Sequence, residues 1–126
     1  MDSRLAVELE IAALRQLQEE YRHTNWYLFQ ERLKPPSLVL TEASQRLGCW
    51  MRQERTIALS RRMVMTEPWG VVREVLKHEM AHQYVDEALG LTHQGSHGPA
   101  FQQVCQQRGI DGRAQGTPTD AGLRSA

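Results

Sequence analysis

The segment from Glu67 to Leu89 restricts the fold more than any other part of the chain. It has the length of a helix, and Gly90, a residue typical of the position just after a helix end, follows it. Residues three or four positions apart lie on one face of a helix. On the face that this spacing defines, two histidines stand in an otherwise apolar row: Val71, Val75, His78, His82, Val85 and Leu89. A buried imidazole needs partners for both of its ring nitrogens.

The spacing of these two histidines suits a metal ion. Positions i and i+4 bring the two Cβ atoms to about 5–6 Å, and the imidazoles can then converge on one zinc ion at about 2.0–2.1 Å. Glu79 follows His78 and is turned by about 100° around the helix axis, beside the open metal position. The pattern His-Glu-x-x-His therefore predicts two ligands, His78 and His82, and a general base, Glu79. The alternative is a helix with two hydrogen-bonded histidines and a solvated glutamate.

A catalytic zinc site usually has a third protein ligand. The metzincin pattern would supply a third histidine at the position of Ala88. The thermolysin-like pattern would supply a glutamate from a later helix, and no glutamate follows Glu87. The candidates that remain are His93, His97, Asp111 and Asp120. We favour His97, because the Gly-Pro pair after it begins a helix whose apolar residues would hold the ligand in place. His93 lies in a freer loop.

Three helices are expected. Asp2 or Ser3 is expected to cap the first, which runs to about Phe29, ahead of a pair of prolines. Thr66 is expected to cap the second, with Pro68 in its first turn. The third begins at the Gly-Pro pair and ends before Gly109. Along the first helix apolar residues recur at helical spacing, and we expect them and the aromatic residues near its end to face the core: Leu5, Leu9, Ala13, Leu17, Tyr21, Trp26, Tyr27 and Phe29.

Three short extended segments stand between the first two helices: Ser37–Thr41, Leu47–Arg52 and Arg55–Ser60. Their lengths and the two residues between the last pair predict a small three-stranded antiparallel sheet with a hairpin. About three helices packed on this sheet make an α+β domain that spans residues 1–108. Residues 109–126 are rich in Gly, Thr, Ala and Asp, and they predict a disordered tail.

Bulk properties narrow the function. The 126 residues carry zero net charge, so no overall field draws the chain to nucleic acid or to an anionic membrane. The N-terminal residues are charged throughout, and no stretch approaches the roughly 20 apolar residues of a membrane span. We therefore expect a cytoplasmic protein without a membrane partner. Cys49 and Cys105 form no metal or redox motif, and we interpret both as reduced core residues.

Several pieces of the sequence together resemble the SprT-like family, which includes the Spartan metalloproteases. They are HEMAH and the later HGPAF, the segment TNWYLFQERLKPPSLVL near the start of the domain, and the strand pair in LGCW and RTIALS. The resemblance covers about residues 20–108. It implies a minimal zincin fold, with His78, His82 and His97 as ligands of one Zn²⁺ and Glu79 as general base. It also implies peptidase activity on protein or peptide substrates, which Spartan directs at proteins crosslinked to DNA.

Two other interpretations stay open. One is a metal-stabilised module that binds DNA or protein with little or no turnover, and the other is a domain without metal. For DNA the sequence offers five arginines near the expected sheet: Arg46, Arg52, Arg55, Arg61 and Arg62. We interpret them as a solvated basic edge, partly paired with Glu54 and Glu67, rather than as a nucleic-acid surface. The sequence gives no signal of oligomeric state.

Overall fold

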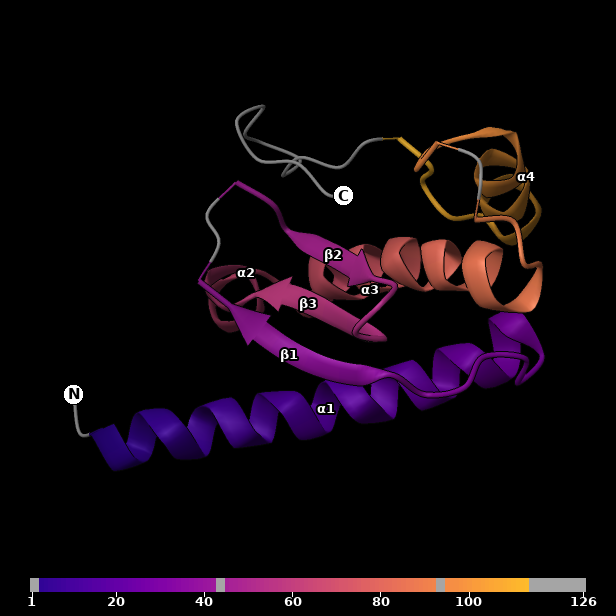
Figure 1. Cartoon of the computed structure of the whole chain (residues 1–126). Coiled ribbons are helices and arrows are strands. Elements are labelled where there is room, and N and C mark those ends of the chain that lie inside the picture. The colour runs from indigo at the N-terminus through magenta and orange to yellow at the C-terminus, as the bar shows by residue number, and fades with distance from the viewer. Residues whose placement is uncertain (1–2, 43–44, 93–94, 114–126) are drawn as a thin grey trace.

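The structure is a computed structural model that describes residues 3–42, 45–92 and 95–113. These residues form four α-helices, one π-helix and three strands, in the order α1, β1, β2, β3, α2, α3, η1, α4. The arrangement is α+β, as expected. Helix α1 runs beside the β1 edge of the sheet, α3 packs against β2 and β3, and α4 packs against α3 (Figure 1). None of the helices in these residues combines the length and the apolar character that a bilayer crossing requires.

Helix α1 (Ser3–Phe29) confirms the predicted first helix. It ends before the prolines because Gln30 and Glu31 adopt left-handed backbone conformations, with φ of 54° and 57°. The side-chain amide of Asn25 then bonds the backbone of Leu33 in both directions, at 2.8 and 3.1 Å. This exchange turns the chain from α1 toward β1.

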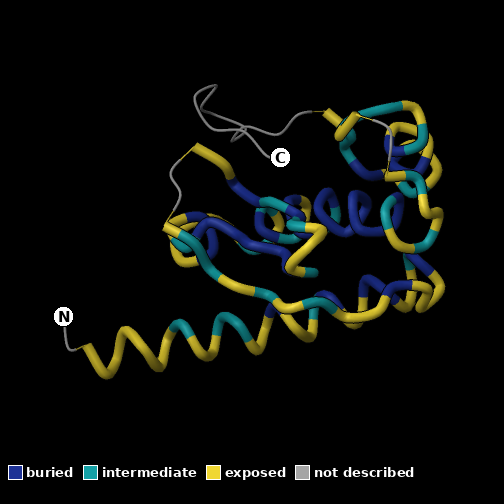
Figure 2. Tube along the Cα trace, in the orientation of Figure 1, coloured by how far each residue is buried: buried dark blue, intermediate teal, exposed yellow. Residues whose placement is uncertain are grey.

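The residues of α1 that we expected to face the core divide into three groups, of which Ala13 alone is half-buried against the core. The buried ones are Leu17, Tyr21 and Phe29. The exposed ones are Leu5, Leu9, Trp26 and Tyr27. The expectation that all of them face the core was wrong for the exposed group. The N-terminal part of α1, which carries Leu5 and Leu9, projects past the sheet and is largely exposed (Figure 2), whereas Trp26 and Tyr27 lie in the last turn of the helix.

The sheet is mixed rather than antiparallel, which corrects the prediction. Its order is β1-β3-β2, with β1 (Ser37–Thr41) parallel to β3 (Thr56–Ser60) and β2 (Gly48–Met51) antiparallel to β3. The predicted hairpin is present between β2 and β3. A parallel pair needs a connection of a dozen or more residues, and the stretch 42–55 supplies it by carrying β2. Strand lengths and the short β2–β3 turn do not specify the direction of β1, and β1 and β2 flank β3 on opposite sides.

A short helix, α2 (Arg61–Thr66), precedes α3 and was not predicted. Ser60 caps it, since the Ser60 hydroxyl accepts a hydrogen bond from the backbone N–H of Met63 at 3.1 Å. Thr66 is therefore the last residue of α2 and not the N-cap of the following helix. Glu67 is extended, as the residue before a proline tends to be. Pro68 then stands just ahead of α3 (Trp69–Gln83).

The rest of the predicted second helix is present as α3 and a continuing π-helix, η1 (Tyr84–Ala88). The helical run ends at Gly90, whose φ of 67° confirms the expected left-handed end. Helix α4 (Pro99–Arg108) ends at Gly109 in the same conformation, with φ of 68°. Both cysteines are free thiols, one half-buried on β2 and one buried on α4.

Candidate metal centre

Three histidines meet between α3 and the start of α4. His78 and His82 lie one turn apart on α3, and His97 stands two residues before α4. Their potential ligand atoms all lie within 4.8 Å of one another. The Nε2 atoms of His78 and His97 are 3.3 Å apart, and two nitrogens in tetrahedral positions around zinc are separated by about 3.3–3.4 Å. The geometry of these residues fits a shared metal ion.

One aromatic ring packs on all three imidazoles. The Phe101 ring stacks on His82, with centroids 4.1 Å apart and planes 15° apart, and lies 5.0 Å from the rings of His78 and His97. The sequence predicted only that the apolar side of α4 would hold His97 in place. Phe101 is four residues after His97 in the HGPAF stretch, but His97 precedes α4, so helical spacing does not predict this contact.

The hydrogen bond on the far side of His78 selects its ligand atom. Nδ1 of His78 lies 3.0 Å from the backbone carbonyl oxygen of Asp111. A carbonyl only accepts, so this partner assigns the proton to Nδ1 and leaves Nε2 with a lone pair directed toward His97. Burial lowers the pKa of His97, which favours the neutral imidazole that a metal requires.

Glu79 is buried beside these histidines. Its side chain is 0% exposed, and no donor among the described residues meets hydrogen-bond geometry with either carboxylate oxygen, although the backbone N–H of Trp50 lies near enough to lower its pKa. Burial raises the pKa of Glu79 to about 8, and the nearby backbone amide of Trp50 and the charge on Arg46 offset only part of that rise. The solvated glutamate of the alternative interpretation is therefore wrong. An ionisable group with so perturbed a pKa is a candidate for chemistry.

A glycine on β2 makes room for this carboxylate. A Cβ atom at Gly48 would stand 2.9 Å from Cγ1 of Val75, 3.0 Å from Cδ2 of Leu59 and 3.1 Å from Cγ of Glu79. Strand β2 therefore approaches α3 more closely than any larger residue at this position would allow. The backbone of β2 at Gly48 thus lies directly against the Glu79 side chain as well as against Val75.

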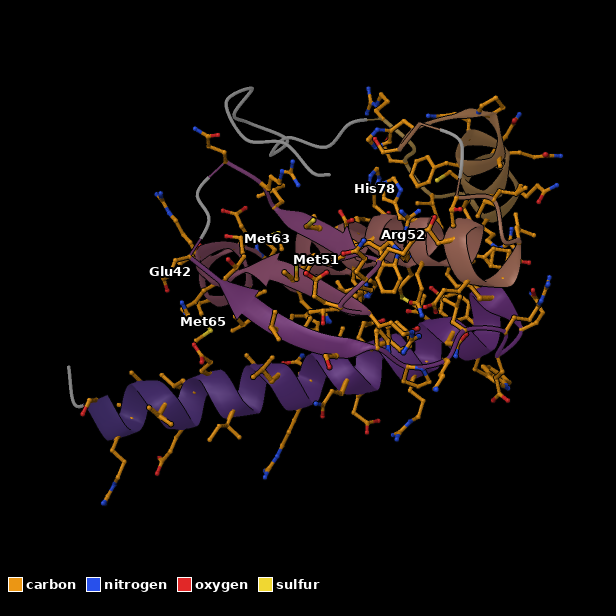
Figure 3. All side chains as sticks on the ribbon, viewed as in Figure 1. Glu42, Met51, Arg52, Met63, Met65 and His78 are labelled. Carbon is orange, nitrogen blue, oxygen red and sulfur yellow. The ribbon has the colours of Figure 1, made fainter. Side chains whose placement is uncertain are left out.

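A cavity of about 430 Å³ opens beside His82, between the β2–β3 hairpin and the chain that follows α3. Its lining includes Trp50, Met51, Arg52, Val85, Asp86 and Leu91. The indole N–H of Trp50 donates to the Asp86 carboxylate at 2.7 Å, which joins the sheet wall to the helix wall. Figure 3 shows Met51 and Arg52 on the sheet side of this region and His78 toward α4.

The other predicted candidates divide into two groups. His93 and Asp120 lie outside the described residues. Asp111 reaches the site through its backbone carbonyl, and its carboxylate forms an ion pair with Arg113 at 2.9 Å.

The expected basic edge is partly neutralised, although by other acids than predicted. Arg55 pairs with Glu87 at 2.6 Å. Arg61 pairs with Glu10 and Glu42. These acids take the place of the expected partners Glu54 and Glu67 within the part of the chain that the structure describes.

Comparison with known proteins places the chain in a family. The model of the SprT-like family matches residues 14–120, most of the chain, and the matched region contains the three histidines, Glu79 and Phe101. No curated protein and no solved structure gives a match. The chain belongs to the SprT-like family.

Proposed function

We propose that the protein is a zinc-dependent metallopeptidase with a minimal zincin fold, in which His78, His82 and His97 hold one Zn²⁺ and Glu79 is the general base. The observation that carries the proposal is the buried carboxylate of Glu79, which lacks a hydrogen-bond partner beside three imidazoles that fit one metal ion. Burying a polar group without a partner costs free energy. A purely structural metal site has no need of such a group, whereas a hydrolytic site does.

The residues suggest how the reaction would proceed. When bound, zinc supplies Lewis-acid polarisation of the scissile carbonyl and lowers the pKa of its water toward about 7. With a metal held by His78, His82 and His97, Glu79 would accept a proton from the attacking water and would return it to the leaving amine nitrogen as the C–N bond breaks. Glu79 must be ionised to act as a base. The positive charge of a metal ion held by the three histidines would lower its pKa from the value near 8.

The substrates that we propose are protein or peptide chains. The cavity beside His82 is large enough to take a substrate side chain, and His82 is the member of the histidine cluster that lines it. DNA-associated proteins enter the proposal only through the family. The ion pairs of Arg55 and Arg61 reduce the charge that the basic edge offers to a nucleic acid.

A comparison of Glu79→Gln with Glu74→Gln tests the proposal. Both residues lie on α3, and Glu74 is exposed and pairs with Lys77. Both variants should retain about one zinc per chain by elemental analysis. Only Glu79→Gln should lose cleavage of unfolded casein, by about 10²–10⁴-fold. The assay is run with and without single-stranded DNA, since a requirement for DNA would identify the substrate class.

Each outcome has a distinct meaning. Equal cleavage by the wild type and Glu79→Gln would remove Glu79 as the base. A wild-type protein that neither contains zinc nor takes it up would remove the metal. Zinc uptake without cleavage by the wild type, in either condition, would favour the alternative of a metal-stabilised binding module.

A further inference from the structure

The chain that follows α4 folds back onto the histidine cluster. Gly109 turns it in a left-handed conformation, and the backbone N–H of Ile110 donates to the carbonyl of Cys105 at 2.9 Å. The Ile110 side chain is 6% exposed and belongs to the core cluster. These contacts hold the next residue so that the Asp111 carbonyl oxygen lies 3.0 Å from Nδ1 of His78.

Gln102 joins this returning segment, residues 109–112, to the loop that carries His97. Its Nε2 donates to the carbonyl of Gly112 at 3.1 Å and to the carbonyl of His97 at 3.4 Å. A Cβ atom at Gly112 would stand 2.7 Å from Oε1 of Gln102 and 3.3 Å from Cβ of Cys105. The returning segment therefore fits against α4 closely, and a larger residue at 112 would displace the Gln102 side chain from its hydrogen bonds and press against Cβ of Cys105.

We propose that the returning segment is a positioning element of the metal centre. The Asp111 backbone carbonyl holds His78 in the tautomer that presents Nε2, and Gln102 couples this contact to the position of His97. Asp111 acts through its main chain, since its carboxylate pairs with Arg113. The metal part of this inference rests on the proposed function. The tautomer part does not, because the hydrogen bond joins His78 to the backbone of Asp111 and involves no metal.

The physical reason is that a neutral imidazole can offer either nitrogen. A hydrogen-bond acceptor fixed on one side decides which nitrogen is protonated and how the ring is oriented. Backbone supplies that acceptor here, so no side chain substitution removes it directly. Changes at Gly112 and Gln102 can move it.

The first test is the tautomer of His78 in the metal-free protein. Long-range ¹H–¹⁵N NMR on the full chain distinguishes the two ring nitrogens, and the signal is assigned by its loss in His78→Asn. We expect Nδ1 to carry the proton and Nε2 to be unprotonated at pH above the imidazole pKa. A His78 ring protonated at Nε2 instead would overturn the proposal, whatever the protein does with zinc.

The second test is the zinc affinity of full-chain variants, measured by competition with a chromogenic chelator. Gly112→Val should weaken zinc binding by about 10–100-fold and alter the absorption spectrum of the cobalt-substituted protein. Gln102→Ala should weaken binding several-fold. Gln103→Ala, the neighbouring exposed glutamine on α4, is the matched control and should leave affinity within about two-fold, since surface substitutions away from such contacts have small effects.

Wild-type affinity and an unchanged cobalt spectrum in folded Gly112→Val would overturn the proposal. If Gly112→Val fails to fold, the pair Gln102→Ala and Gln103→Ala decides it: equal affinities would overturn the coupling, and a selective loss in Gln102→Ala would support it. Failure of the wild type to bind zinc would contradict the proposed function, and the NMR result would then decide the inference alone.

Discussion

The N-terminal half of α1 and the whole of α3 have similar helical lengths but opposite surroundings. On α1, Leu5 and Leu9 are apolar and yet 47% and 44% exposed. On α3, His78 and Glu79 are polar and fully buried (Figure 2). Periodicity assigns residues to a face of a helix, but it does not say whether another element covers that face. Helix α3 lies against β2, β3 and α4, whereas the start of α1 projects past the sheet.

Buried polar groups on α3 are paired, with one exception. The side-chain Oε1 of Gln83 accepts a hydrogen bond from the Tyr21 hydroxyl at 2.8 Å. Its Nε2 donates to the backbone carbonyl of Lys34 at 2.8 Å and to the Glu87 carboxylate at 3.0 Å. Glu79 alone has carboxylate oxygens without a partner among the described buried side chains. Since folding tolerates such a group only at a cost in free energy, the contrast with Gln83 supports a chemical role for Glu79.

The largest change in the free energy of unfolding should come from truncating a leucine in α3, and truncating a leucine in α1 is the comparison. Leu76→Ala on α3, where Leu76 is 0% exposed, should lower the free energy of unfolding by about 2–5 kcal/mol, because it leaves a cavity in the core. Leu9→Ala on α1 should lower it by about 0.5 kcal/mol or less. Urea denaturation in the presence of a chelator measures both. A loss in Leu9→Ala as large as in Leu76→Ala would mean that the start of α1 is covered in solution.

The next largest effect is a dependence of the free energy of unfolding on pH, which arises from Glu79 on α3. Burial raises the pKa of this carboxyl from 4.5 to about 8, so between these values the folded metal-free protein keeps a proton that the unfolded chain releases. Stability should therefore fall as pH rises through this window, by at most about 1.4 kcal/mol per pH unit, and the contribution should be constant below and above it.

Glu79→Gln removes the titrating group, so its free energy of unfolding should vary less between pH 5 and pH 8 than that of the wild type. Denaturation of both metal-free proteins across this range measures the difference. Parallel pH profiles would show that Glu79 does not titrate in this window. Glu74→Gln, at an exposed position on the same helix, is the control and should keep the wild-type profile.

The sequence predicted the parts of the site that one helix contains. The spacing of His78, Glu79 and His82 follows from helix geometry alone, and His97 followed from the turn before α4. The part that was wrong and the parts that were not predicted depend on contacts between distant segments. The parallel pairing of β1 with β3, the carbonyl of Asp111 on His78 and the approach of Gly48 to Glu79 leave no periodic signal in the sequence. They arise from how elements pack after each has formed.

The smallest change in stability that we expect comes from a substitution that tests one of those contacts, the approach of β2 to α3. Gly48→Ala would place a Cβ within 2.9–3.1 Å of Val75, Leu59 and Glu79, and overpacking of this kind costs about 1–3 kcal/mol. Gly70→Ala is the matched control. Gly70 lies in the first turn of α3 with nothing within 4 Å of its Cβ position, and alanine there should stabilise the helix by about 0.5–1 kcal/mol.

Thermal and urea denaturation of the two alanine variants should thus give changes of opposite sign. Because the obstructing atoms include Cγ of Glu79, Gly48→Ala should also lower casein cleavage with zinc content unchanged, whereas Gly70→Ala should leave both at the wild-type level. A stable and fully active Gly48→Ala would show that β2 can withdraw from α3 without moving the carboxylate. The close contact would then be a feature of core packing that the chemistry does not require.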